Sequence, residues 1–309
     1  MSENIRPAAI VGMGPAGIAA SIYLARSNVF PVCFEEKEIG GKLRVMKEIE
    51  NYPGYFGEAK GLADDFEKQV EHFHIEVKKE SVRSVAQNAD GTFTLKTDKD
   101  SYIFQTVIIA TGIREKPFKV PGSEAYFENG ISRCAECDAP FHKNKPVAII
   151  GNSSEAMKDT LYLASLCNPV YLLNEGSSFS ADPALVKEVL TNPKVIYKEN
   201  VKVVSSEGKR RLESLTLKHV DGKEEKIAVE GFFLFLGATP MADFLGYMDV
   251  LDEKGNIRVD DHMRTSVPGL FAVGDVRNAV LRQVVTAVSD GGVAAVSARS
   301  YLTSLHKKN

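Results

Sequence analysis

Two stretches of the chain share one order of apolar and polar positions. Each begins with a short apolar run that ends in glycine, AAIVG at 8–12 and PVAIIG at 146–151. A helical period of apolar residues follows, and then a second apolar run, FPVCFEE at 30–36 or PVYLLNE at 169–175. This order is typical of a buried strand, a tight turn, a helix and a parallel strand. The pattern therefore predicts two βαβ units in tandem.

Alternating apolar and polar positions predict further strands in both halves of the chain. They are SVRSVAQ (81–87), TFTLKT (92–97), YIFQTVIIATG (102–112), KVIYKE (194–199), VKVVSSE (201–207), LESLTLKHV (212–220), EGFFLFLG (230–237) and GLFAVGDV (269–276). Helices are predicted from about 61 to 73, after a loop that contains GGKL and ENYPGY, and from about 281 to 305.

The second unit looks inserted into the first. The N-terminal unit has no closing strand until GLFAVGDV near the end of the chain, and the turn-rich stretches REKPFK and ATPMAD mark the boundaries. We expect an α/β protein of two Rossmann-like, three-layer (ββα) dinucleotide-binding-type domains. Residues 1–114 and 243–309 form the first domain, and residues 115–242 form the inserted one.

Bulk properties exclude several classes of protein. The chain has 309 residues, 44% apolar and 26% charged, which is ordinary for a globular protein of two domains. The net charge of −3 by itself argues neither for nor against a nucleic-acid partner, and we expect none because the short basic runs fit solvated loop and tail. No apolar run has membrane-spanning length, and the N-terminal apolar stretch is broken by glycine and proline. We therefore expect a cytoplasmic protein that binds no membrane.

The first glycine-rich turn predicts a dinucleotide site. Gly12, Gly14 and Gly17 form G-x-G-x-x-G between a strand and a helix, where a pyrophosphate can approach the backbone and the helix N-terminus. Glu35 ends the next strand, where its carboxylate can accept hydrogen bonds from ribose hydroxyls.

Two later stretches favour a flavin over a nicotinamide in this first domain. TVIIATG (106–112) and TSVPGLFAVGDV (265–276) each end a strand in small residues, which allows a cofactor to come close. Asp275 is placed to bond a ribityl hydroxyl. The helix that starts near Arg282, Gln283 and Val284 can direct its amide groups at the flavin pyrimidine ring. The expected cofactor is FAD.

Cys134 and Cys137, in CAECD, are separated by two residues. Such a pair can close a redox disulfide at a helix start, or it can be half of a zinc site. The chain has no second paired-cysteine motif, because Cys33 and Cys167 stand alone in apolar patterns and are expected to be buried. We favour the redox pair and expect no metal. His142, five residues on, is expected to lie at the surface.

Over essentially its whole length, the sequence resembles the low-molecular-weight thioredoxin reductases. The matching motifs are VGMGPAG, GGKL, ENYPG, ATG, CAECD, PGLFAVGD and RQV, in family order and at family spacing. The resemblance implies a homodimeric, two-domain FAD enzyme whose redox pair lies on the inserted domain. The cofactor-binding residues that it implies, together with those above, are Gly12, Gly14, Pro15, Ala16, Gly17, Glu35, Gly41, Lys42, Leu43, Asn51, Thr111, Gly112, Gly274, Asp275, Arg282, Gln283 and Val284.

The resemblance also assigns roles around the cysteine pair. Cys137 would face the flavin, Cys134 would attack the disulfide of a partner protein, and Asp138 would donate and accept the proton. Two positions depart from the family. Glu136 stands where threonine is usual, which should raise the thiol pKa values or alter partner choice, and Lys42 stands where glutamine is usual.

The second glycine turn departs further from the family. GNSSEA stands where G-x-G-x-x-A would bind NADPH, and Ser153 replaces the second glycine. Where the family has His-Arg-Arg and a further arginine for the 2′-phosphate, this chain has Asn174, Glu175, Gly176 and, downstream, Ala181. Loss of the arginine forks and addition of a carboxylate both disfavour NADPH.

These departures narrow the resemblance to the pyridine-nucleotide-independent, ferredoxin-linked thioredoxin reductases. We expect electrons to enter from ferredoxin or flavodoxin and to leave to thioredoxin or a similar small redox protein. A domain rotation is implied, because one disulfide cannot face a buried flavin and a large partner at once. The alternatives are an NADH- or NADPH-dependent reductase with an altered nucleotide site, a small-molecule dithiol oxidase that uses oxygen, and a flavoprotein that only senses or binds.

Overall fold

The computed structural model describes residues 5–127, 129–246 and 248–306, and the chain divides into two compact units. One unit comprises the residues up to Arg114 together with those from Thr239 onward, and the other is Glu115–Ala238. The first unit thus resumes at Thr239 instead of at residue 243. The reason is that the backbone N–H of Met241 donates to the carbonyl of Gly112 at 3.0 Å, within the first unit.

The first unit is built on a mixed sheet. Its parallel strands are β5 (Glu76–Lys79), β2 (Val32–Glu35), β1 (Arg6–Val11) and β8 (Ser101–Ile109), in this spatial order, with β19 (Leu270–Ala272) parallel to β8. β7 (Phe93–Thr97) and β6 (Val82–Gln87) continue the sheet in antiparallel pairing. The strand β19 closes the sheet from the far end of the sequence, as the incomplete N-terminal βαβ unit requires.

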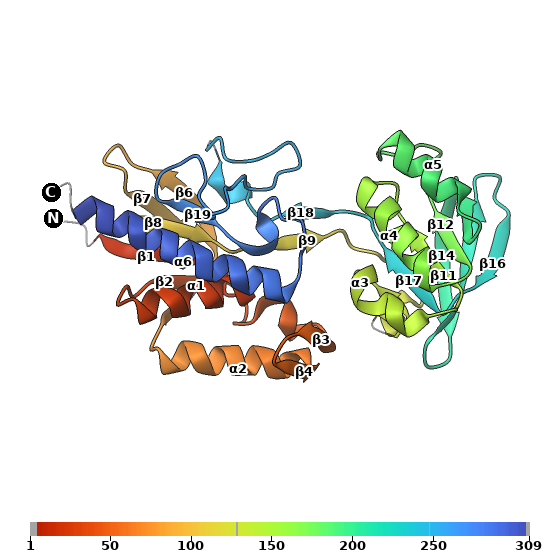
Figure 1. Ribbon diagram of the computed structural model, residues 1–309, viewed down its shortest axis with the longest axis horizontal. Coiled ribbons are helices and arrows are strands. Elements are labelled where there is room, and N and C mark those ends of the chain that lie inside the picture. The colour runs from red at the N-terminus through yellow and green to blue at the C-terminus, as the bar shows by residue number, and fades with distance from the viewer. Residues whose placement is uncertain (1–4, 128, 247, 307–309) are drawn as a thin grey trace. The chain divides into compact units, whose positions relative to one another are not determined.

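Three helices cover one face of this sheet, and they share a continuous apolar core (Figure 1). They are α1 (Pro15–Arg26), α2 (Ala59–His72) and α6 (Val284–His306). α1 and α6 approach closely because of Gly291, where an added Cβ would lie 2.2 Å from the carbonyl oxygen of Ala16. A second apolar core lies on the opposite face and includes Phe93, Phe104 and Ile257.

Two segments of the first unit differ from the expectation. The stretch predicted to be a loop contains the 3₁₀ helix η1 (Gly41–Arg44) and a hairpin of β3 (Glu48–Tyr52) and β4 (Tyr55–Glu58). The C-terminal helix begins at Val284 instead of near 281, because Thr286 holds the preceding residues in a turn. Its hydroxyl donates to the carbonyl of Leu281 at 3.0 Å and accepts from the backbone N–H of Gln283 at 3.2 Å.

The second unit has three layers. Its parallel sheet has the order β10 (Ile131–Ser132), β17 (Gly231–Leu234), β11 (Val147–Ile150), β12 (Val170–Leu173) and β13 (Val195–Lys198). One apolar core joins it to the antiparallel sheet of β14 (Val201–Gly208), β15 (Leu212–His219) and β16 (Glu224–Ala228). Another core joins it to α3 (Ala135–Asp138), α4 (Ser154–Leu166) and α5 (Pro183–Thr191). The expected ββα layering and α/β fold class are confirmed.

The chain passes between the units in two strands that pair with each other. They are β9 (Ile113–Glu115) and β18 (Ala238–Pro240). The remaining short helices are η2 (Ser123–Tyr126), η3 (Ala139–His142), η4 (Asp243–Leu245) and η5 (Gly274–Val276). None of the helices in the described residues is long and apolar enough to cross a membrane.

Candidate active site

The first glycine turn has the geometry that a bound pyrophosphate requires. Gly12 has φ +98°, and a Cβ there would lie 2.5 Å from the carbonyl oxygen of Ala110. A Cβ on Gly17 would lie 1.9 Å from the carbonyl oxygen of Gly12, so turn and helix are in direct backbone contact. At Gly14, by contrast, no atom lies within 4 Å of an added Cβ. The turn therefore presents open backbone at the start of α1.

Neighbouring residues named from the sequence surround this turn. Pro15 opens α1, whose N-cap Gly14 supplies no side-chain cap. A Cβ on Gly41 would lie 3.0 Å from the Cα of Gly14, and a Cβ on Gly274 would lie 3.1 Å from the Cβ of Ala16. Leu43, a residue of η1, is fully buried. The segments that begin η1 and η5 thus converge on the first turn of α1.

Glu35 lies at the end of β2 and is held by the backbone. Its Oε2 accepts from the N–H of Met13 at 2.9 Å, and its Oε1 accepts from the N–H of Lys37 at 2.9 Å. Each oxygen of a carboxylate can accept a further hydrogen bond. The carboxylate is thus fixed beside the glycine turn with acceptor capacity for ribose hydroxyls.

Asp275 and Lys42 lie together at the other side of the turn. The ammonium of Lys42 is 3.7 Å from Oδ2 of Asp275. The turn that carries Asp275 is fastened by Asp290, which the sequence analysis did not name. Asp290 accepts from the N–H of Gly274 at 3.0 Å and from the guanidinium of Arg277 at 2.7 and 2.8 Å. A carboxylate inside the apolar helix pattern TAVSDGGVAAV is the signal that could have found it.

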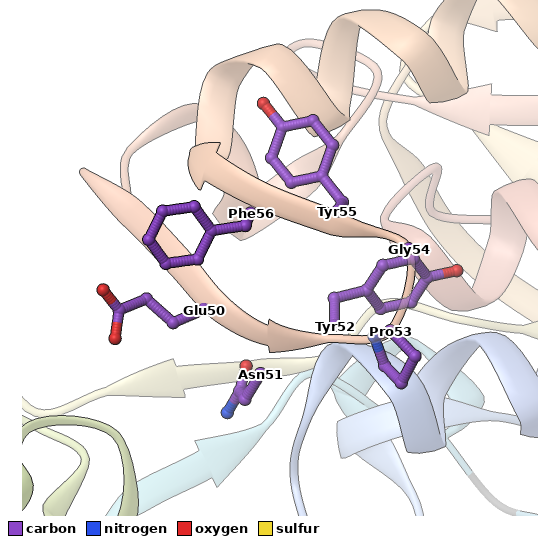
Figure 2. A pocket seen from close by; sticks show the side chains of 7 residues that line it. All are labelled: Glu50, Asn51, Tyr52, Pro53, Gly54, Tyr55 and Phe56. Carbon is purple, nitrogen blue, oxygen red and sulfur yellow. The ribbon is translucent and has the colours of Figure 1, made fainter.

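Asn51 and Gln283 are brought together across 232 positions of sequence: the amide of Asn51 donates to Oε1 of Gln283 at 3.0 Å. Asn51 belongs to the β3–β4 hairpin, whose residues 50–56 line a surface pocket (Figure 2). In that view Asn51 and Tyr55 point to opposite sides of the hairpin.

The other predicted cofactor residues lie close to partners within the first unit. Arg282 donates to Oδ1 of Asn256 at 3.0 Å, and the helix α6 begins at Val284. The hydroxyl of Thr111 donates to the carbonyl of Met241 at 2.5 Å, beside Gly112, which has φ +71°.

These residues fit a flavin dinucleotide. The open backbone at Gly14 suits the pyrophosphate, and the fixed Glu35 carboxylate suits the adenosine ribose. Asp275 can accept a hydrogen bond from a polyol, and the amides of Asn51 and Gln283 offer a donor and acceptor pair for a polar ring edge.

Cys134 and Cys137 form a disulfide in the second unit, with Cα atoms 5.3 Å apart. Cys134 is the N-cap of α3, and its Sγ accepts from the N–H of Cys137 at 3.1 Å. Asp138 ends this short helix, half-buried, whereas Glu136 is exposed. The described residues contain no group of acidic, histidine or cysteine side chains that could hold a metal ion.

The remaining cysteines are buried and free, as expected. Burial raises the pKa of Cys33, and burial raises that of Cys167 to about 11, so neither is a ready thiolate. The surface position expected for His142 is wrong. Its ring is half-buried because it packs over Gly231, where an added Cβ would lie 3.1 Å from ring atoms, and burial lowers its pKa.

The second glycine turn is organised differently from the first. Ser153 is the N-cap of α4, and its Oγ accepts from the N–H of Ala156 at 3.2 Å. Next to it, the carbonyl of Asn152 accepts from the N–H of Ser180 at 2.9 Å. A Cβ on Gly151 would lie 2.7 Å from the carbonyl oxygen of Phe235, so the one glycine kept here serves close packing.

In the loop after β12, the side chain of Asn174 forms hydrogen bonds with the loop's own backbone. Asn174 is buried, its amide donates to the carbonyl of Ser178 at 3.0 Å, and its Oδ1 accepts from the N–H of Gly176 at 3.1 Å. Glu175 is exposed. Residues 174–182, NEGSSFSAD, contain neither lysine nor arginine. The loop therefore presents an exposed carboxylate and no cationic side chain.

Comparison with known proteins shows the family. The family model of the pyridine nucleotide-disulphide oxidoreductases matches residues 6–291. A thioredoxin reductase of Treponema pallidum (strain Nichols) is 35% identical over 299 residues, which cover 96% of this chain and 97% of that protein.

Two solved structures bear on the fold and the subtype. The thioredoxin reductase of Streptococcus pyogenes MGAS5005 has a TM-score of 0.92 at 33% identity, covering 98% of this chain and 100% of that one. A ferredoxin-flavin thioredoxin reductase of Clostridium acetobutylicum has a TM-score of 0.55 at 28% identity, covering 99% of this chain and 100% of that one.

Proposed function

Because the chain belongs to the pyridine nucleotide-disulphide oxidoreductase family, we propose that it reduces thioredoxin or a similar small redox protein with electrons from a protein donor. The chain is a flavin-dependent disulfide oxidoreductase whose cofactor is FAD. The donor that we propose is ferredoxin or flavodoxin, and the chain would then belong with the ferredoxin-linked reductases. The buried free thiols of Cys33 and Cys167 fit a reducing, cytoplasmic setting.

The second glycine turn is the observation that supports a protein donor. In a pyridine-nucleotide site the helix N-terminus offers its N–H groups to the pyrophosphate. In this chain Ser153 accepts from one of these groups, and its side chain stands at the position where backbone must meet the phosphates. Glu175, in a loop without cations, adds repulsion toward a 2′-phosphate. Both features disfavour NADPH as the electron donor.

The cysteine pair is the proposed exit for electrons. Two electrons and two protons open the Cys134–Cys137 bond to two thiols. The Cys134 thiolate then attacks the disulfide of thioredoxin, forms a mixed disulfide and releases one thioredoxin thiol. Cys137 attacks Cys134 Sγ in that mixed disulfide, which closes the original bond and frees reduced thioredoxin. Asp138, adjacent to Cys137 in sequence, supplies the proton that the departing thiolate needs.

The first unit holds the cofactor in this proposal. When bound, FAD supplies a carrier that takes electrons singly from an iron–sulfur protein and returns them in pairs. Gly14, Pro15 and Ala16 would hold its diphosphate, and Glu35 would accept from the adenosine ribose. Lys42 and Asp275 would hold the ribityl chain.

We also propose that the enzyme is a homodimer. Tyr23 on α1 lies beside Gly292 on α6, since a Cβ on Gly292 would be 3.7 Å from the Tyr23 ring. Val285 and Val296 recur on the same side of α6, and all three large side chains are 40–53% exposed. An apolar face across two helices suits a second copy of the chain. Val296→Glu should make the protein monomeric by light scattering, and an unchanged mass would refute this assignment.

A second candidate donor is NADH. The exposed carboxylate of Glu175 follows β12, and in dinucleotide sites an acid at the end of the second strand accepts from a free ribose 2′-hydroxyl. Ser153 counts against this candidate as it does against NADPH.

Anaerobic reduction of the bound flavin tests the donor directly. The holoenzyme is mixed with NADPH, NADH, reduced ferredoxin or reduced flavodoxin, and flavin absorbance is followed by stopped flow. We expect a protein donor to bleach the flavin at least about 100-fold faster than either nucleotide, which corresponds to about 2.7 kcal/mol of barrier. Rapid bleaching by NADPH or NADH would refute the protein donor. A Cys134→Ser variant should still accept electrons but should not reduce thioredoxin.

A further inference from the structure

Arg133, the residue directly before Cys134, is held by three separate contacts within the second unit. Its Nε lies 3.1 Å from Oε2 of Glu115, and its Nη1 donates to the carbonyl of Lys116 at 3.1 Å. Its guanidinium carbon lies 5.3 Å from the centroid of the Phe127 ring. The side chains of Arg133 and Glu115 are 26% and 35% exposed, so water screens the ion pair only in part. A planar guanidinium with this set of partners has a defined orientation.

The anchor of Arg133 is the ribbon in which the chain passes between units. Glu115 ends β9, which pairs with β18. The pairing extends one residue further, because the N–H of Lys116 donates to the carbonyl of Gly237 at 3.2 Å. The two groups that Arg133 contacts, a carboxylate and a carbonyl, therefore belong to a hydrogen-bonded pair of strands and not to a free loop.

The other end of the connection is the redox pair. Ser132 Oγ accepts from the N–H of Cys134 at 3.0 Å and donates to its carbonyl at 3.2 Å. Cys134 Sγ in turn accepts from the N–H of Cys137. A disulfide forms only within a narrow range of distance and orientation of the two Cβ atoms. Contacts that fix the backbone at Arg133 therefore also restrict the distance and orientation of the two cysteine side chains.

We propose that Arg133 is a positioning residue for the redox pair: its side chain, bound to Glu115 and Lys116, fixes the backbone next to Cys134 so that the disulfide is favoured over the open dithiol. This inference deepens the proposed function and rests on it for its physiological meaning. Without the contacts of Arg133 to Glu115 and Lys116, the two thiols are less well oriented to form a disulfide, and the Cys134–Cys137 bond is reduced more easily.

The test measures the disulfide equilibrium and needs neither an electron donor nor thioredoxin. The holoenzyme is equilibrated anaerobically with mixtures of reduced and oxidised dithiothreitol, which gives two electrons and two protons to the protein disulfide and becomes a cyclic disulfide itself. The sample is quenched in acid and alkylated, and mass spectrometry counts the thiols. The variants are Arg133→Met, Arg133→Lys, Glu115→Gln and the Arg133→Met/Glu115→Gln pair. Lys145→Met is the control, because it removes an exposed ion pair with Glu230 elsewhere in the same unit.

We expect the equilibrium constant for reduction to rise about fivefold in Arg133→Met, which is about 20 mV for a two-electron couple. The equilibrium constant of Glu115→Gln should also be higher than that of wild type, and the constant of the double variant should equal that of Arg133→Met. The constant of Arg133→Lys should lie between those of wild type and Arg133→Met. The Lys145→Met control should match wild type. The proposal would be overturned if wild type and a folded Arg133→Met had equal equilibrium constants for reduction. It would also be overturned if the effect of the double variant equalled the sum of the effects of the two single changes. If Arg133→Met does not fold, Glu115→Gln decides alone.

The outcome is separable from that of the donor experiment. An enzyme that accepts electrons from NADPH would refute the protein donor and leave the disulfide equilibrium untouched. Unchanged equilibrium constants would refute the role of Arg133 and leave thioredoxin reduction intact.

Discussion

Replacing Asp290 with alanine is expected to lower the free energy of unfolding of the first unit by about 3–5 kcal/mol. The Asp290 side chain is 8% exposed and that of Arg277 is 18% exposed, so the pair is largely withdrawn from water. The carboxylate accepts three N–H groups, two from Arg277 and one from Gly274. Its loss would leave a buried guanidinium without its carboxylate, and this uncompensated charge accounts for the size of the effect.

The same change should weaken FAD binding. Gly274 precedes Asp275 and has φ +70°, and Asp290 is the acceptor that holds its N–H. Without that contact the turn can move, and Asp275 moves with it. We expect the dissociation constant of FAD to rise at least about tenfold, which is a loss of about 1.4 kcal/mol.

Urea unfolding of apo and FAD-bound protein, followed by circular dichroism, checks the first value, and fluorescence of released FAD checks the second. Asp65→Ala is the matched control, since Asp65 pairs with Lys68 on the surface of α2 with both side chains more than half exposed. That change should cost no more than about 1 kcal/mol. An Asp290→Ala effect as small as the control's would refute the argument from burial.

Three further changes test other parts of the site. Ser153→Ala should cost the second unit about 1 kcal/mol because α4 loses its N-cap, whereas Ser153→Gly should cost only a few tenths; urea unfolding measures both, and equal losses would contradict the cap. In the Ser153→Gly background, Glu175→Arg should tighten NADPH binding about 30-fold, as measured by calorimetry. The change removes a repulsion of about 1 kcal/mol between the carboxylate and the 2′-phosphate and adds an attraction of about 1 kcal/mol from the guanidinium, both for charges about 4 Å apart in water. Asp159 has its pKa raised to about 6, chiefly by burial and then by Glu136 and Glu155. The folded state therefore binds this proton more tightly than the unfolded state, and the stability that the proton contributes is lost as pH rises through about 6. Asp159→Asn should remove that loss, so its urea midpoint should exceed that of wild type at about pH 7.5 and the gap should narrow toward about pH 4; a constant gap would contradict the shift.

The elements with strong apolar periodicity could be predicted from the sequence. β1, β8 and β19 are buried along most of their length, and their apolar runs predicted them. The β3–β4 hairpin was missed because its strands, EIENY and YFGE, expose most of their residues and carry no clear alternation. The helix α5 had a usable signal that was overlooked: Asp182 precedes Pro183, and its Oδ1 accepts from the N–H of Ala184 at 2.8 Å.

Contacts between residues far apart in the chain could not be predicted in this way. The motifs marked Asn51 and Gln283 separately, and only the folded chain shows that their side chains bond each other. Asp290 and Gly274 are 16 positions apart, and their contact depends on how α6 packs against η5. Arg133 gave no signal, because a basic residue before a cysteine pair is ordinarily a solvated side chain and its partner Glu115 lies in another element.

The two glycine turns offer a phosphate different surroundings at the start of a helix. The first N–H groups of any helix need acceptors from outside the helix. At α1 the N-cap is Gly14, which offers no side-chain acceptor and has no atom within 4 Å of an added Cβ, so an anionic ligand can satisfy these groups. At α4 the N-cap is Ser153, whose hydroxyl already accepts from Ala156. A phosphate arriving at α4 would have to displace that cap, at a cost of about 1 kcal/mol, before making any contact of its own. Ser153 therefore caps α4 and opposes a pyrophosphate at this turn, in keeping with the protein donor that we propose.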